Sequence, residues 1–172
     1  MFPVGFTGPS GVGKTTLLEK VLARLVSRGR TVSAIKSSHH LTDIDRPGKD
    51  SYRFRTAGAG EVLLVGPERW ALMKETADGQ PPLSELLARM APVDFVLVEG
   101  YKSEESIARI FIHRRDFAAD KPEAGVIPAG VAAVATDDPD LVVPEGVHKL
   151  DLNSPGAVAN FIVALKANSD LI

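Results

Sequence analysis

The sequence has 172 residues, of which 44% are hydrophobic and 24% are charged, and this predicts a single globular domain spanning residues 1–172. The formal net charge of −2 excludes a broadly basic surface for nucleic acid, and the lack of cysteine excludes disulfides and thiolate metal sites. We expect no signal peptide and no membrane-spanning segment, and a chain without cysteine fits a cytoplasmic location.

Strand-like and helix-like segments alternate along the chain. In chain order we expect a strand at 3–6, a helix at 14–28, a strand at 31–36, a helix at 51–57, a hairpin of 61–66 and 69–74, a helix at 83–90, strands at 93–100, 107–114 and 131–136, and a helix at 154–168. This alternation predicts an α/β three-layer sandwich: a mostly parallel sheet with helices on both faces, extended by the hairpin.

Two of these strands differ in pattern. The segment 93–100 is continuously apolar, which is typical of a buried central strand. The segment 107–114 alternates between apolar and polar residues, so we expect it to be less buried and to form a sheet edge that could pair with a second copy.

The clearest motif is FTGPSGVGKTTLLEKVLARL, which starts at Phe6. It matches G-x-x-x-x-G-K-[ST] between an expected strand and an amphipathic helix, the context of a P-loop. The predicted nucleotide-binding residues are Gly8, Ser10, Gly11, Val12, Gly13, Lys14, Thr15 and Thr16. Lys14 would reach the β- and γ-phosphates as a catalytic cation, and the Thr15 hydroxyl would hold Mg²⁺. The alternative is a glycine-rich helix start without a ligand, which the strand–loop–helix context disfavours.

A second candidate follows the apolar strand in FVLVEGY. P-loop proteins place a carboxylate near the metal at the end of such a strand, so we expect Glu99 to act as a catalytic and metal-binding residue. The alternative is an ordinary solvated glutamate at a strand end.

The polar stretch IKSSHHLTDIDRPGKDSYRF is a candidate second anion-binding or partner-binding loop. Its candidate residues are Lys36, His39, His40, Asp43, Lys49 and Asp50, and Asp45 is a candidate metal ligand. The alternative is a flexible surface loop in which Asp50 or Ser51 caps the next helix. A zinc site formed by the adjacent His39 and His40 is disfavoured, because neighbouring residues rarely offer the required geometry alone.

A reader of the nucleotide base is harder to find. No N/T-K-x-D motif follows a clear strand, although HKLD at 148–151 keeps K-x-D. The sequence Thr136-Asp137-Asp138 ends an apolar strand, and a carboxylate there could accept the two hydrogen-bond donors of guanine. We favour Asp137 for this role over the alternative of an Asp-rich turn before Pro139.

The motifs GPSGVGKTTLLEKV, IKSSHH, DIDRPGKDSYRFRTAGA, ERWALMKET and LVEGYKSE together resemble the MobB family of molybdopterin-guanine dinucleotide biosynthesis accessory proteins, over roughly residues 4 to 165. The resemblance implies a GTP-binding P-loop protein, usually a homodimer, with at most weak GTPase activity. It also implies a partner, the enzyme that transfers GMP onto molybdopterin, and it raises molybdopterin as a further ligand.

Two other functions remain open from the residues themselves. One is a P-loop small-molecule kinase that uses ATP, for which Arg109, Arg114 and Arg115 would be candidate lid arginines. The other is a scaffold with a vestigial P-loop, against which the intact Lys14 argues. Trp70, the only tryptophan, is predicted either in the core or at a dimer interface.

Overall fold

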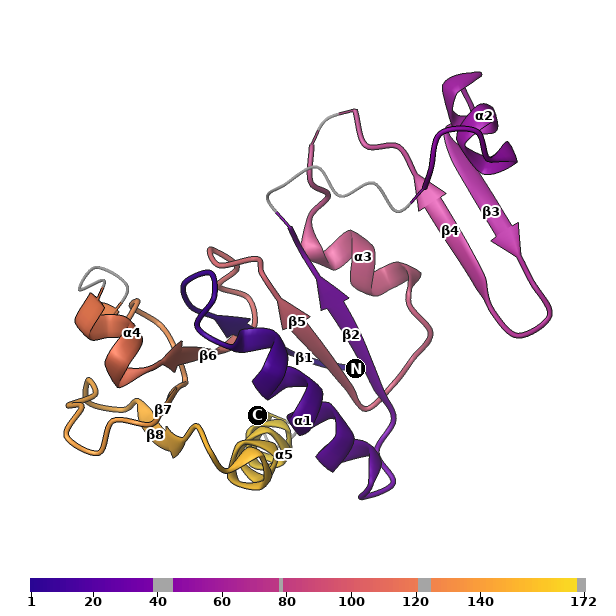
Figure 1. Cartoon of the computed structure of the whole chain (residues 1–172). Coiled ribbons are helices and arrows are strands. Elements are labelled where there is room, and N and C mark those ends of the chain that lie inside the picture. The colour runs from indigo at the N-terminus through magenta and orange to yellow at the C-terminus, as the bar shows by residue number, and fades with distance from the viewer. Residues whose placement is uncertain (39–44, 78, 121–124, 170–172) are drawn as a thin grey trace. The chain divides into compact units, whose positions relative to one another are not determined.

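The computed structural model describes residues 1–38, 45–77, 79–120 and 125–169. The chain forms two compact units: unit 1 comprises Met1–Ser37 and Ala91–Ile172, and unit 2 comprises Ser38–Met90. Figure 1 labels the helices and strands of the two units. The expectation of one domain over the whole chain stays a prediction.

Unit 1 is built on a six-stranded sheet with the order β2-β5-β1-β6-β7-β8. The strands are β1 (Phe2–Thr7), β2 (Val32–Lys36), β5 (Phe95–Glu99), β6 (Ala108–His113), β7 (Ala133–Thr136) and β8 (His148–Asp151). Every neighbouring pair is parallel. The carboxyl ends of all six strands therefore lie at one edge of the sheet, where α/β proteins bind their ligands.

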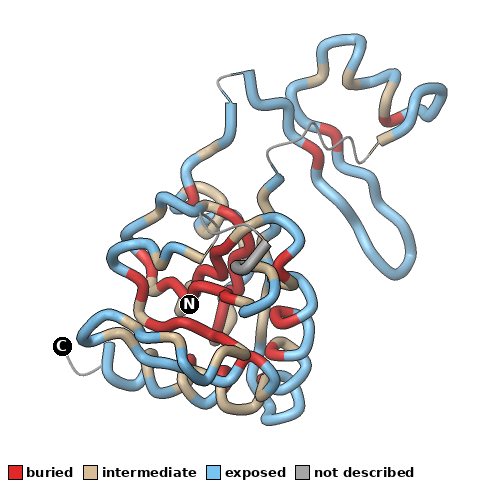
Figure 2. Tube along the Cα trace, turned by 60° about the vertical axis from the view of Figure 1, so that its left-hand side comes forward, coloured by how far each residue is buried: buried red, intermediate tan, exposed pale blue. Residues whose placement is uncertain are grey.

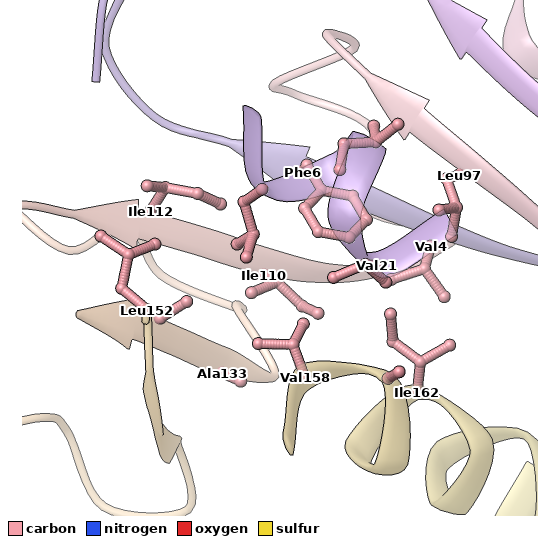
Figure 3. Packing of buried hydrophobic residues seen from close by; sticks show 14 of the residues in the cluster. Val4, Phe6, Val21, Leu97, Ile110, Ile112, Ala133, Leu152, Val158 and Ile162 are labelled. Atoms are coloured by element: carbon pink, nitrogen blue, oxygen red, sulfur yellow. The ribbon is translucent and has the colours of Figure 1, made fainter. Parts of the chain in front are cut away.

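One face of this sheet carries two long helices, α1 (Lys14–Val26) and α5 (Pro155–Ser169), which pack against each other. Their apolar stripes meet the inward-facing residues of β1, β5 and β6 in the main core (Figure 3). Phe6, Val21, Ile110 and Ile162 are all fully buried there. Figure 2 shows the buried residues of unit 1 gathered along its strands.

The other face of the sheet has a smaller cluster over β6 and β7. Phe111, Val131 and Val134 form it, and partly buried side chains from the segment 127–147 pack onto them. Loop segments thus cover this part of the sheet. The short helix α4 (Arg115–Asp120) follows β6 at the carboxyl edge.

Unit 2 contains α2 (Asp50–Thr56), the antiparallel hairpin β3 (Glu61–Val65) and β4 (Trp70–Lys74), and α3 (Leu83–Arg89). The hairpin buries Val62 opposite Met73. The expected hairpin and the mostly parallel α/β sheet are confirmed. No helix in the described ranges is both long and apolar enough to cross a bilayer.

The expectation for 107–114 is wrong. β6 lies between β1 and β7 in the sheet and is not an edge strand, and five of its six residues are buried. The polar residues that suggested exposure are buried with partners: the guanidinium of Arg109 donates to the carbonyls of Lys102 and Ala129, and the His113 ring bonds Thr136. Polar residues can be buried when they are hydrogen-bonded. The alternation of apolar and polar residues in β6 therefore does not mean that one face of this strand is exposed to solvent.

The prediction that Trp70 lies in the core is also wrong, because the exposed fraction of Trp70 is 68%. Two elements were not predicted, α4 and the edge strand β8. Both are short, and β8 shows only intermediate or exposed residues, so the apolar run that would indicate a strand is missing.

Candidate nucleotide-binding site

The loop from Gly8 to Gly13 connects β1 to α1 at the carboxyl edge of the sheet. Gly8, Gly11 and Gly13 all have positive φ, at 142°, 84° and 97°. Gly8 is also constrained by space, because a Cβ there would lie 2.9 Å from the carbonyl oxygen of Ile112. Such a backbone lets successive N–H groups turn toward one point at the positive end of α1, which is how a P-loop binds phosphate.

Lys14, the first residue of α1, folds back over this loop. Its ammonium donates to the carbonyl oxygens of Gly8, at 3.0 Å, and Pro9, at 2.6 Å. Partial burial lowers the pKa of Lys14 from its ordinary value, while the carboxylate of Glu99 acts in the opposite direction. The ammonium is held by neutral carbonyls, which an anionic phosphate would outcompete.

Thr15 and Glu99 meet beside the loop. The Thr15 hydroxyl lies 3.0 and 2.8 Å from the two carboxylate oxygens of Glu99, although 84 residues separate them in sequence. Glu99 is the last residue of β5 and is paired in register with Phe6 of β1, just before the P-loop. This register explains why a buried carboxylate comes to lie at the start of α1.

The Thr15–Glu99 pair fits a magnesium ion. Both side chains offer oxygen, and Mg²⁺ is usually held by one or two protein groups together with substrate phosphates and water. In the part of the chain that the structure describes, no group of three or more acidic, histidine or cysteine side chains could hold a metal. A metal at Thr15 and Glu99 would therefore depend on the nucleotide for its other ligands.

Lys36 extends this cluster. It is the last residue of β2, in register with Glu99, and its ammonium lies 3.1 Å from the Thr15 hydroxyl and 3.4 Å from the Glu99 carboxylate. The sequence suggested a second anion site for Lys36. The structure instead places the Lys36 ammonium against Thr15 and Glu99, the predicted metal ligands. These residues are far apart in the sequence, so the sequence did not indicate the contact.

The ends of β2 and β5 are in close contact. A Cβ on Gly100 would lie 2.6 Å from the Cβ of Ser37, and Gly100 has a φ of 104°. The Ser37 amide also donates to the Glu99 carbonyl at 2.7 Å. Tyr101, the next residue, has a φ of 49°, which non-glycine residues rarely adopt. The backbone around Glu99 is thus tightly defined.

Arg114 is a site residue that the sequence analysis considered only as a kinase lid. Its guanidinium donates to the carbonyl of Val12 in the P-loop at 3.1 Å and pairs with Asp137 at 3.2 Å. It also packs against Gly13, within 3.5 Å of a Cβ built there. The polar pair Arg114-Arg115 directly after an apolar strand was the available signal.

Asp137, the candidate base reader, follows β7 as expected. However, one of its carboxylate oxygens pairs with Arg114 and the other accepts the Arg115 amide at 2.9 Å. Asp138 pairs with the Arg115 side chain at 3.0 Å. Asp137 therefore links the β6 and β7 ends to the P-loop, and both of its oxygens already have partners.

The remaining loop candidates belong to unit 2 or lie outside the description. Asp45 accepts a hydrogen bond from Ser51 at 2.9 Å and lies 3.6 Å from Arg55, contacts within unit 2 that lend no support to a metal role. Lys49 and Asp50 are exposed at the start of α2, and Asp50 pairs with Arg53. The other three candidates, His39, His40 and Asp43, fall outside the described residues.

In the P-loop itself, Val12 is buried in the main core, whereas Ser10 and Thr16 are exposed. Thr16 follows Thr15 on the first turn of α1, so its amide lies at the helix terminus that faces the loop. The structure thus brings together the P-loop, Glu99, Lys36 and Arg114 in unit 1.

Comparisons with known proteins identify the family of this chain. The family model "MobB: Molybdopterin guanine dinucleotide synthesis protein B" matches residues 4–137. A protein from Escherichia coli named "Molybdopterin-guanine dinucleotide biosynthesis adapter protein" is 44% identical over 167 residues, covering 95% of this chain and 93% of that protein. A protein of the same name from Haemophilus influenzae is 43% identical over 92% of this chain and 86% of that protein.

Solved structures share the fold. The MobB homolog from Bacillus stearothermophilus has a TM-score of 0.67 and 25% identity, covering 98% of this chain and 99% of that one. MobB from Bacillus subtilis has a TM-score of 0.70 at 19% identity, covering 95% and 97%. With the family model matching residues 4–137 and relatives above 40% identity along nearly the whole chain, this protein belongs to the MobB family of molybdopterin guanine dinucleotide synthesis proteins.

Proposed function

We propose that this protein is a GTP-binding adapter that assists the attachment of GMP to molybdopterin in molybdenum cofactor biosynthesis. The observation that carries the nucleotide-binding part is the contact of the Thr15 hydroxyl with Glu99 beside a P-loop that ends in Lys14. The pathway is supported by relatives named as adapters of molybdopterin-guanine dinucleotide biosynthesis, which align with this chain over nearly its whole length.

The residues suggest how the nucleotide is held. The P-loop N–H groups and the start of α1 bind the phosphates, and Lys14 exchanges the Gly8 and Pro9 carbonyls for phosphate oxygens. Thr15 and Glu99 hold Mg²⁺, which supplies charge neutralisation on the phosphate chain. Arg114 keeps the loop in place through the Val12 carbonyl.

Guanine is favoured by the pathway rather than by a base-reading motif. Asp137 and Asp138 lie at the end of β7, but both carboxylates pair with arginines. A guanine-reading role for Asp137 would require its carboxylate to accept the base in addition to, or in place of, Arg114 and the Arg115 amide. It stays a prediction.

We propose that hydrolysis is at most slow. Fast GTP hydrolysis needs a positioned water and an extra positive charge on the transferring phosphoryl group. Arg114 is the arginine that contacts the P-loop, and it is already bonded to Val12 and Asp137. Nucleotide binding, rather than turnover, is then the property that the partner enzyme senses. A cytoplasmic location stays a prediction.

A homodimer is supported by the hairpin of unit 2. Side chains alternate between the faces of a strand, so Leu63 and Val65 share one face with their cross-strand partners Leu72 and Trp70. All four are exposed, by 56%, 69%, 42% and 68%. A contiguous apolar face of this kind is typical of an interaction surface, and we propose a second copy of the chain as its partner.

The second anion site in 36–50 stays a proposal. Its described members outside unit 1, Lys49 and Asp50, are exposed and available to a partner or to molybdopterin. The substitution Lys49→Ala should reduce partner-dependent GMP transfer while leaving GTP affinity intact, because Lys49 is exposed, whereas Asp45 is held by Ser51 and Arg55. Unchanged transfer would remove this loop from the proposal.

Calorimetric titration with GTP and ATP, each with Mg²⁺ or EDTA, tests the main proposal. We expect GTP to bind in Mg²⁺ at least tenfold more tightly than ATP, about 1.4 kcal/mol. Lys14→Ala should weaken GTP by roughly a hundredfold, because it removes a charged donor from two phosphates. Lys20→Ala, an exposed lysine on the same helix, is the matched control.

The outcomes of these titrations distinguish the GTP-binding adapter from the kinase and from the scaffold. Equal or tighter binding of ATP would overturn the guanine assignment and favour a small-molecule kinase, which acceptor-dependent release of ADP would then identify. Absence of binding to either nucleotide would favour a scaffold with a vestigial P-loop.

A further inference from the structure

Lys36 occupies a position that the proposed metal also needs. Its ammonium lies 3.1 Å from the Thr15 hydroxyl oxygen and 3.4 and 3.5 Å from the two carboxylate oxygens of Glu99. These are the same oxygens that would hold Mg²⁺ with the nucleotide. The ammonium thus contacts both of the side chains, Thr15 and Glu99, that we propose as the protein ligands of the metal.

The two partners of this ion pair differ in mobility. The side chain of Glu99 is only 11% exposed, whereas that of Lys36 is 62% exposed. Glu99 is fixed at the end of β5, while Lys36 ends on a flexible four-carbon stem that can carry its charge into water. Lys36 can therefore leave the pair, and Glu99 cannot.

The negative charge of Glu99 requires a cation beside it, either the Lys36 ammonium or the metal. Without metal, the buried carboxylate of Glu99 would face the bound phosphates uncompensated, and a buried unpaired charge is costly. Lys36 supplies the compensation from the neighbouring strand. A divalent ion between Thr15 and Glu99 would repel the ammonium at this distance, so the two cations cannot share the pair.

We propose that Lys36 is the built-in counter-ion of the metal site: its ammonium and Mg²⁺ occupy the Thr15–Glu99 pair alternately, so that Lys36 sets how strongly nucleotide binding depends on Mg²⁺. This inference rests on the proposed binding of a nucleoside triphosphate. It assigns Lys36 as a positioning residue of that site and gives it no role in catalysis.

Lys36 lies close to the point where the chain leaves unit 1. It is the last residue of β2, and the chain passes from unit 1 to unit 2 directly after Ser37. Ser37 in turn lies against Gly100, next to Glu99. Exchange of the two cations therefore changes the charge two residues before the chain enters unit 2 at Ser38.

The test compares GTP affinity in Mg²⁺ with GTP affinity in EDTA for wild type and Lys36→Met. Methionine keeps an unbranched apolar side chain and removes the charge. We expect affinity in EDTA to fall, because Glu99 then repels the phosphates, and affinity in Mg²⁺ to be kept or improved. The ratio of the two affinities should rise at least tenfold.

Lys36→Arg keeps the positive charge and should keep the ratio within about threefold of wild type, a difference of about 0.7 kcal/mol. Lys20→Met is the matched control for loss of an exposed lysine and should leave the ratio unchanged. Because the readout is a ratio within one variant, partial unfolding lowers both affinities and does not imitate the expected result.

An unchanged ratio in Lys36→Met would overturn this inference alone. Equal losses in Mg²⁺ and in EDTA would also overturn it, since they would identify Lys36 as a simple phosphate contact. A wild-type protein that binds no GTP under either condition would contradict the proposed function and this inference with it.

Discussion

At the scale of single residues, Arg114 connects parts of the site that are far apart in sequence. Its Nε donates to the Val12 carbonyl, 102 residues away, and its terminal nitrogen pairs with Asp137. It therefore ties the P-loop to the ends of β6 and β7. Hydrogen bonds that involve a charged group are stronger than neutral ones, so this contact should help to pre-organise the phosphate cradle.

We therefore predict that Arg114→Gln weakens GTP binding by roughly tenfold, about 1.4 kcal/mol, through a loss of loop order. Isothermal titration calorimetry measures the change. Arg24→Gln on the exposed side of α1 is the matched control and should bind as wild type. Wild-type affinity in Arg114→Gln would show that the loop holds its shape without the arginine.

Gly100 is required for its backbone conformation and for its close approach to Ser37. Gly100 and Gly58 have nearly identical φ angles, 104° and 103°, but a Cβ would meet Ser37 at 2.6 Å in the first case and nothing within 4 Å in the second. Both substitutions to alanine carry backbone strain of about 1–3 kcal/mol. Only Gly100→Ala adds a clash.

We predict that Gly100→Ala lowers the free energy of urea unfolding by about 1–3 kcal/mol more than Gly58→Ala, the usual cost of overpacking. Far-UV circular dichroism follows the unfolding. Equal losses in the two variants would mean that Ser37 moves aside without cost.

At the scale of elements, β2 and β5 are joined at their amino ends by side chains. The carboxylate of Asp94 accepts from both the amide and the hydroxyl of Thr31 at 2.9 Å, and Thr31 accepts in return from the Asp94 amide at 2.8 Å. Lys166 of α5 lies 3.6 Å from the same carboxylate. The Thr31 hydrogen bonds, with a smaller effect of Lys166, lower the pKa of Asp94 below its ordinary value.

A lowered carboxyl pKa means that ionised Asp94 stabilises the fold above its unfolded pKa, and that this stabilisation is lost as the pH falls through the folded pKa. We predict that Asp94→Asn melts below wild type at neutral pH and that the two melting temperatures converge below pH 3.8, its usual pKa. Glu145→Gln, an exposed acid elsewhere in unit 1, is the control. A difference in melting temperature that does not depend on pH would mean that Asp94→Asn destabilises the fold through its shape and not through the loss of charge.

At the scale of the whole molecule, the exposed apolar face of the β3–β4 hairpin predicts self-association. Leu63 and Leu64 are adjacent and almost equally exposed, by 56% and 57%, but their side chains lie on opposite faces of the hairpin. Leu63 shares its face with Trp70, whereas Leu64 is paired with Ala71.

We predict that Leu63→Ser raises the dimer dissociation constant at least tenfold, about 1.4 kcal/mol, within the range for burial of one leucine. Leu64→Ser, its matched control, should have a smaller effect. Size-exclusion chromatography with light scattering over a range of concentrations measures both. Equal effects would exclude this face as the interface.

The sequence alone was sufficient where the determining residues are neighbours. The glycines and Lys14 of the P-loop lie within seven positions, and the periodic leucines of α1 follow them directly, so loop and helix could be recognised together. The hairpin followed from two apolar runs separated by Gly66 and Pro67. In each case local backbone preference and side-chain periodicity specify the element.

The tertiary structure decided which distant residues meet. The strand order placed β6 in the middle of the sheet, although its alternation indicated an edge. It also brought Lys36 to Glu99 across 63 residues and Arg114 to Val12 across 102. Periodicity reports which face of a strand is apolar but not which strand lies beside it, because pairing depends on how the whole chain packs. The P-loop was therefore readable from the sequence, whereas the cations around it became visible only in the fold.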